Sequence, residues 1–125
     1  MQYDKIEGLD KKISKLILGN DNQTNFDSAK MLWDHWIEVG GNAFDNAYIY
    51  GNGIMEKLLG QWHINRNIRD ELVIIAKGAH TPNCDPQNLI NQLDESLDRM
   101  QISYADIYIM HRDNTNIPVD EFIDV

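Results

Sequence analysis

Four ionisable side chains of different types stand at or just after the ends of short apolar runs: Asp45, Tyr50, Lys77 and His111. An ammonium close to a phenol favours the phenolate form, and a carboxylate supplies the counter-charge that holds the ammonium there. A histidine opposite them can donate a hydrogen bond to a substrate carbonyl oxygen. Together they suit a general acid that protonates an oxyanion, a role that contributes about 10²–10⁴-fold to a rate. Carbonyl reduction by hydride transfer from a nicotinamide needs such a donor.

The elements that would position these residues alternate between strand-like and helix-like stretches. Apolar runs such as LVIIAK predict buried strands, and apolar residues at i, i+3 and i+4 spacing predict amphipathic helices. Asp85 and Pro86 would begin one helix, and Gly40 and Gly41 stand where a left-handed C-cap is expected. The predicted strands cover 13–19, 42–47, 72–77 and 105–111; the predicted helices cover 26–41, 53–66 and 87–100, with another from Pro118.

The predicted strands begin about 30 residues apart, which is the length of one β-α unit of a parallel sheet. Four such units are the N-terminal half of a (β/α)8 barrel, whereas a flavodoxin-like open sheet has nearly the same local pattern. Periodicity alone does not choose between these two folds. In both, the carboxyl ends of the strands meet at one edge, where Asp45, Lys77 and His111 would gather.

Several segments resemble the signature motifs of the aldo-keto reductases. GGNAFDNAYIYGNG, followed by Glu56 and by Leu59-Gly60, is similar to the family segment Gly-x-Asn-x-Phe-Asp-Thr-Ala that leads to Tyr-Gly. RDELVIIAK resembles the third-strand segment that ends in Lys, ESLDRM the Ser-Leu-x-Arg-Leu helix, and DIYIMHRD the fourth-strand segment that ends in His. The segments occur in family order over essentially the whole chain.

The resemblance implies a catalytic tetrad of Asp45, Tyr50, Lys77 and His111. Tyr50 would be the proton donor and Lys77 would favour its phenolate form. Asp45 would pair with Lys77 and approach the nicotinamide ribose, while Tyr50 and His111 would contact and orient the substrate. The implied reaction is reduction of an aldehyde or ketone, a small-molecule carbonyl substrate, with NADP(H) or NAD(H) as the cofactor.

By the same resemblance, cofactor contacts are expected from Gly19, Asn20 and Asp45. The chain departs from the family pattern at three places: Asn20 and Asn46 stand where Thr is usual, and Met55 stands where Ser usually precedes the glutamate. None of these departures removes a member of the tetrad. They bear on cofactor contacts and substrate preference and leave the reaction class unchanged.

Composition excludes several classes of function. The chain has 125 residues, a net charge of −9 and scattered basic residues, which argues against a nucleic-acid partner. No apolar run is long enough to span a bilayer, so no membrane partner is expected. Cys84 is the single cysteine, which fits a reducing compartment, and we expect a cytoplasmic protein. The four histidines lack ligand spacing, and no metal site is predicted.

Residues 1–125 are interpreted as one partial domain, the N-terminal half of an aldo-keto reductase-like barrel. The preferred hypothesis is an NAD(P)H-dependent carbonyl reductase or the N-terminal part of one. The alternative is a truncated, non-catalytic half-barrel that acts as an interaction or assembly module. A half-barrel leaves strand edges unpaired, so we expect self-association or pairing with a complementary half-barrel.

Overall fold

The computed structural model describes residues 1–23 and 25–125, and its centre is a parallel sheet of four strands. The strands lie side by side in chain order. A flavodoxin-like sheet would have the order 2-1-3-4-5, so the sequential order is that of a barrel. The prediction of parallel β/α units is therefore confirmed. The strands are β3 (Leu18–Gly19), β4 (Ala43–Asp45), β5 (Val73–Gly78) and β6 (Ile107–Met110).

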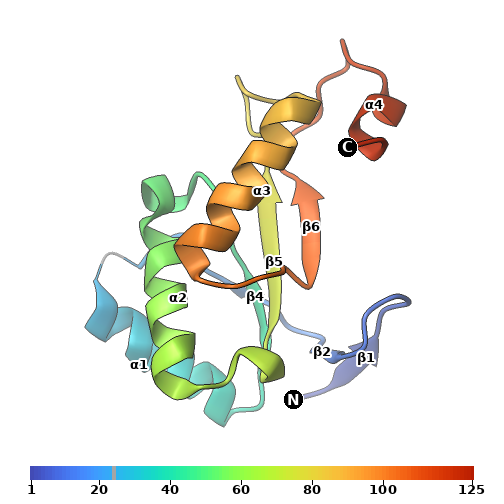
Figure 1. Ribbon diagram of the computed structural model, residues 1–125. Coiled ribbons are helices and arrows are strands. Elements are labelled where there is room, and N and C mark those ends of the chain that lie inside the picture. The colour runs from blue at the N-terminus through green and yellow to red at the C-terminus, as the bar shows by residue number, and fades with distance from the viewer. Residues whose placement is uncertain (24) are drawn as a thin grey trace.

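Three helices connect these strands and cover one face of the sheet, which we call the outer face (Figure 1). In the part of the chain that the structure describes, the opposite, inner face carries no helix. A short helix, α4 (Val119–Ile123), follows β6 beyond the carboxyl end of the sheet. The three covering helices are α1 (Phe26–Glu38), α2 (Ile54–Arg66) and α3 (Pro86–Met100).

Local sequence signals determine where the helices begin and end. The Asp85 side chain accepts a hydrogen bond from the backbone N–H of Asn88 at 2.8 Å, so the predicted N-cap of α3 is confirmed. After α1 the chain turns at Gly40, which has a φ of +89°. Gly41 does not have a left-handed conformation. A side chain is excluded at this position for a different reason, because a Cβ would lie 2.0 Å from the Trp36 ring.

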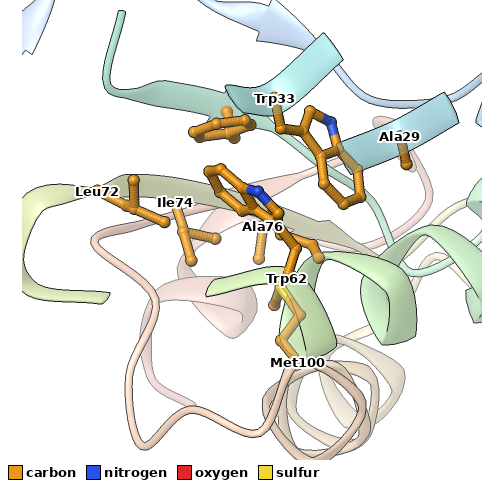
Figure 2. Close-up of a cluster of buried hydrophobic side chains, with 9 residues drawn as sticks. Ala29, Trp33, Trp62, Leu72, Ile74, Ala76 and Met100 are labelled. Atoms are coloured by element: carbon orange, nitrogen blue, oxygen red, sulfur yellow. The ribbon is translucent and has the colours of Figure 1, made fainter. Parts of the chain in front are cut away.

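The main hydrophobic core lies between the outer face and the helices (Figure 2). Trp33 of α1 and Trp62 of α2 are fully buried, with ring centroids 5.4 Å apart. Phe44 of β4 packs against Trp62 at 5.5 Å, and Ile74 and Ala76 of β5 lie beneath them. Because side chains alternate along a strand, the residues between these core positions point to the inner face. Asp45 and Lys77 are two of them.

Two further strands precede the parallel sheet and form an antiparallel hairpin that the sequence did not predict. β1 (Tyr3–Lys5) pairs with β2 (Lys12–Ser14), and every residue of β1 is exposed, so no hydrophobic pattern marks it. Ile13 of β2 is buried with Ala43 and Val73. The hairpin therefore covers the amino-terminal end of the inner face.

The prediction of one strand over 13–19 is wrong, because this segment divides into the end of β2 and the separate strand β3. The Ser14 hydroxyl donates a hydrogen bond to the carbonyl oxygen of Leu16 at 2.7 Å, and the chain bends there. Leu16 and Ile17 are exposed. Their apolar character made the run look continuous. In the described residues no helix has the length and apolar character needed to cross a membrane.

Candidate active site

The register of the sheet brings Asp45 and Lys77 to the same side of its carboxyl edge. Asp45 on β4 is the pairing partner of Ile75 on β5, and Lys77 follows Ile75 by two residues. Both side chains therefore point to the inner face. They border an open pocket of about 410 Å³, and its lining consists of Ile17, Gly19, Asp45, Ile75, Lys77 and Ile109.

The Lys77 ammonium is in contact with two of the predicted site residues. Its Nζ lies 2.5 Å from Oδ1 of Asp45 and donates a hydrogen bond to the Tyr50 hydroxyl oxygen at 2.9 Å. Burial alone would lower the pKa of Lys77, but its bonds and charge interactions with Asp45 and Tyr50 outweigh burial and hold this pKa above its ordinary value. Lys77 is therefore a cation at neutral pH.

Tyr50 is the first residue of a tight turn between β4 and α2. The turn, η1 (Tyr50–Gly53), contains left-handed backbone at Gly51 and Asn52, and Gly53 has a φ of +83°. The chain leading to this turn lies along β5, since the Tyr48 N–H donates to the carbonyl oxygen of Lys77 at 2.9 Å. The loop is thus attached to the strand that carries its hydrogen-bonding partner.

His111 completes the cluster from the end of β6. Its backbone N–H bonds to the Gly78 carbonyl oxygen at 2.6 Å, and its ring meets the Tyr50 ring edge-on at a centroid distance of 5.9 Å. Burial, with the nearby charge of Lys77 adding to it, lowers the pKa of His111 below its ordinary value. The imidazole is therefore neutral at pH 7. Among residues 1–23 and 25–125, nothing forms a hydrogen bond with its buried Nδ1.

The structure thus brings together all four residues that the sequence predicted for the tetrad. It also adds His80, whose ring lies 4.8 Å from that of His111, in an edge-on arrangement. Lys77 is on β5, and His80 lies three residues later, in the loop that follows this strand at the same sheet edge. Its place after a strand carrying a site residue was the signal that could have identified it.

Gly19 and Asn20, the other predicted cofactor contacts, lie at the end of β3 and differ in accessibility. A Cβ on Gly19 would meet nothing within 4 Å, so its backbone faces open space. Asn20 is buried, and its Oδ1 accepts a hydrogen bond from Trp33 Nε1 at 2.9 Å. Its backbone N–H bonds to the Asp45 carbonyl oxygen at 3.0 Å. Asn20 therefore links β3, β4 and α1, whereas Gly19 borders the pocket.

A family model described as the Aldo/keto reductase family matches residues 15–125 of this chain. A probable voltage-gated potassium channel subunit beta of Oryza sativa subsp. japonica is 30% identical, over 98% of this chain and 41% of its own length. An uncharacterized oxidoreductase of Bacillus subtilis (strain 168) is 29% identical, over 97% of this chain and 43% of its own length. Norsolorinic acid reductase B of Aspergillus parasiticus is 29% identical, over 74% of this chain and 28% of its own length.

Solved structures match the fold over nearly the whole chain. A thermostable aldo-keto reductase in complex with the inhibitor epalrestat has a TM-score of 0.83 and 25% identity, over 99% of this chain and 47% of its own. An aldo-keto reductase from Bacillus halodurans, in its holo form, has a TM-score of 0.86 and 25% identity, over 99% of this chain and 44% of its own. The chain spans less than half the length of each of these relatives.

Proposed function

This chain belongs to the aldo/keto reductase family, and on that premise we propose that it supplies the proton-donating side of an NAD(P)H-dependent carbonyl reductase site. The reaction reduces an aldehyde or ketone to an alcohol, with Tyr50 as the proton donor. The observation that carries this proposal is the contact of Lys77 with both Asp45 and the Tyr50 hydroxyl, at 2.5 and 2.9 Å.

The direction of the hydrogen bond between Lys77 and Tyr50 supports the role of Tyr50. The ammonium has only donor hydrogens, so it donates to the phenol oxygen and leaves the phenol's own hydrogen free. That hydrogen is available for a substrate carbonyl oxygen. The positive charge of Lys77 also stabilises the phenolate that remains after proton transfer. Asp45 keeps the ammonium at the end of β5 during this step.

His111 is suited to orienting the substrate. Because its lowered pKa keeps the imidazole neutral at pH 7, it holds a single ring N–H. That N–H can donate to the carbonyl oxygen beside the Tyr50 ring. A neutral histidine is a weaker acid than its cation, so His111 polarises the carbonyl and Tyr50 provides the proton.

The pocket on the inner face fits the nicotinamide end of NADP(H) or NAD(H). Ile17 and Ile75 offer apolar walls, Gly19 leaves open space, and the Asp45 side chain is 35% exposed and can accept hydrogen bonds from ribose hydroxyls. Bound there, the cofactor supplies the hydride for carbonyl reduction. The residues of this chain then hold the ribose, orient the carbonyl and deliver the proton.

Titration with NADPH and with NADH tests the proposal through the fluorescence of the buried tryptophans and through the melting temperature. We expect binding, and turnover of an aromatic aldehyde. Tyr50→Phe should lower kcat by about 10²–10⁴-fold, because the general acid is gone, and should leave the cofactor Kd nearly unchanged. Tyr104→Phe is the matched control, because Tyr104 bonds to Lys11 at 3.1 Å, away from the tetrad. Loss of cofactor binding in Tyr50→Phe would contradict a proton-donor role.

A second proposal concerns assembly and follows from the apolar inner face. Ile17 and Ile109 border the pocket and are 46% and 44% exposed. We propose that a second set of four β/α units, from the same polypeptide or another, covers this face in the active enzyme. Sedimentation velocity of the 125-residue chain tests for pairing between copies. If the chain sediments as a monomer and binds neither cofactor, the reductase assignment fails for this form.

A further inference from the structure

Arg99, near the end of α3, is hydrogen-bonded to the loop that carries Tyr50. Its Nη1 donates to the Tyr48 carbonyl oxygen at 3.0 Å, and its guanidinium lies over the Tyr48 ring at 4.3 Å. The Tyr48 N–H is itself bonded to the Lys77 carbonyl oxygen. Tyr48 is therefore held between β5 on one side and Arg99 on the other, two residues before Tyr50.

Two carboxylates hold the guanidinium in this orientation. Glu56, in the first turn of α2, is fully buried, and its Oε2 accepts from Arg99 Nη1 at 3.0 Å. Glu95, one turn earlier on α3, accepts a hydrogen bond from Arg99 Nη2 at 2.6 Å and another from the Tyr48 hydroxyl at 2.7 Å. The Arg99 side chain is only 15% exposed. Its position is fixed from both ends of the guanidinium fork.

The turn after Tyr48 needs such an anchor. Gly51 and Asn52 both have left-handed backbone, with φ of 55° and 53°; glycine and asparagine can adopt this conformation, but normally as single residues and not two in succession. Gly53 also has a positive φ, and a Cβ there would lie 2.6 Å from Arg99 Cζ. The Arg99 guanidinium can pack against the turn because Gly53 has no side chain.

We propose that Arg99 is a positioning residue of this site, and that the Glu56–Arg99 pair holds the 48–53 loop so that the Tyr50 hydroxyl stays within hydrogen-bonding distance of Lys77. The role of this contact in proton donation rests on the proposed function. The geometric effect does not, because it concerns only the distance between Tyr50 and Lys77. Within the described residues, the Arg99 guanidinium bonds to Tyr48, Glu56 and Glu95 and forms no hydrogen bond with the Tyr50 or Lys77 side chain.

Nuclear magnetic resonance tests the geometric effect in the 125-residue chain without any ligand. The wild type should show nuclear Overhauser contacts between the Tyr50 ring protons and the Lys77 methylenes. Arg99→Met should lose them. Arg66→Met is the matched control, since Arg66 is also in the last turn of a helix and pairs with Asp34 away from the loop.

Arg99→Lys separates positioning from stability. Lysine keeps a positive charge beside Glu56 but lacks the fork that reaches Tyr48 and Glu95 together. We expect a melting temperature close to that of the wild type, with the Tyr50–Lys77 contacts still lost. This variant carries the test if Arg99→Met fails to fold. Wild-type contact intensities in folded Arg99→Lys would overturn the proposal.

Kinetics then distinguish this proposal from the proposed function. If the wild type reduces a carbonyl, Arg99→Lys should lower kcat by about 10²-fold, because small misplacements of catalytic groups have effects of this size, with the cofactor Kd unchanged. Unchanged kcat would overturn the positioning role. If the wild type has no activity, the proposed function fails, and the resonance contacts still decide whether Arg99 positions the loop.

Discussion

Two Asp–Lys pairs lie at opposite edges of the sheet, and we predict that removing the two aspartates has opposite consequences. Asp106 lies at the amino-terminal edge before β6, and its side chain is only 2% exposed. Its carboxylate lies 2.8 Å from Lys11 Nζ and 2.9 Å from Arg69 Nη1, and it also accepts the Ile74 N–H at 2.9 Å. Asp45, at the carboxyl edge, is 35% exposed and pairs with Lys77.

The expected size of the effect follows from burial. Removing one partner of a buried ion pair destabilises a protein by about 3–5 kcal/mol. Lys11 and Arg69 are 22% and 15% exposed and can recover some hydration, so we expect about 3 kcal/mol for Asp106→Ala. At about 2.1 cal/mol/K per residue, this lowers the melting temperature of 125 residues by about 11 °C. The better hydrated Asp45→Ala should lose about 1 kcal/mol or less.

Thermal unfolding monitored by tryptophan fluorescence measures both variants, and titration of NADPH into the folded protein measures cofactor affinity. Asp106→Ala should melt early but bind the cofactor normally below its transition. Asp45→Ala should melt near the wild type and bind the cofactor weakly. If Asp45→Ala lost as much stability as Asp106→Ala, or if Asp106→Ala melted within about 3 °C of the wild type, the assignment of stability to one edge and chemistry to the other would be refuted.

Two further predictions concern the contact between α2 and the end of α3. Gly60→Ala places a Cβ 2.6 Å from the Met100 carbonyl oxygen. Although alanine favours helices, this overlap should destabilise the protein by about 1–3 kcal/mol. A denaturant midpoint equal to that of the wild type would contradict this expectation. His63 is buried with Nε2 donating to the Met100 carbonyl oxygen at 2.9 Å, and burial lowers the pKa of His63, with Arg69 adding to this effect. As pH falls below about 6.5, His63 is protonated in the unfolded chain but remains neutral in the folded chain. The contribution of His63 to the free energy of unfolding is therefore fully present above that pH and declines below it. His63→Gln should reduce the difference in urea midpoint between pH 7.5 and pH 5, and an unchanged difference would show that His63 does not contribute to it.

Much of the fold and the tetrad could be predicted because their signals are local. β5 begins with four consecutive buried apolar residues, Val73 to Ala76, and α3 begins at an Asp85 cap that the sequence displays directly. Parallel strands place their carboxyl ends at one edge, so residues at strand ends, such as Asp45 and Lys77, were expected to meet. The contact of Lys77 with Asp45 follows from this topology, whereas its contact with Tyr50 was expected from the chemistry of the two side chains and from the family resemblance.

Features that depend on contacts between distant segments could not be predicted in this way. Every residue of β1 is exposed, so nothing in its hydropathy marks the hairpin. The run 13–19 is apolar without a period that identifies a bend at Ser14. Glu56 and Arg99 belong to recognised motifs, but they lie on different helices, and charge on a helix usually indicates a solvated face. Only the packing of α2 against α3 shows that the two are partners.

The Asp45–Lys77 and Glu56–Arg99 pairs together explain how one sheet edge can remain chemically accessible in a stable fold. A lysine held near a tyrosine is useful only if a substrate can reach it, so the Asp45–Lys77 pair must keep part of its surface open. Exposure of that kind weakens an ion pair, and the geometry of the site then needs support from elsewhere. The Glu56–Arg99 pair, buried behind the Tyr50 loop, can supply that support without occupying the pocket. The site is therefore expected to depend on a charge pair that no substrate contacts.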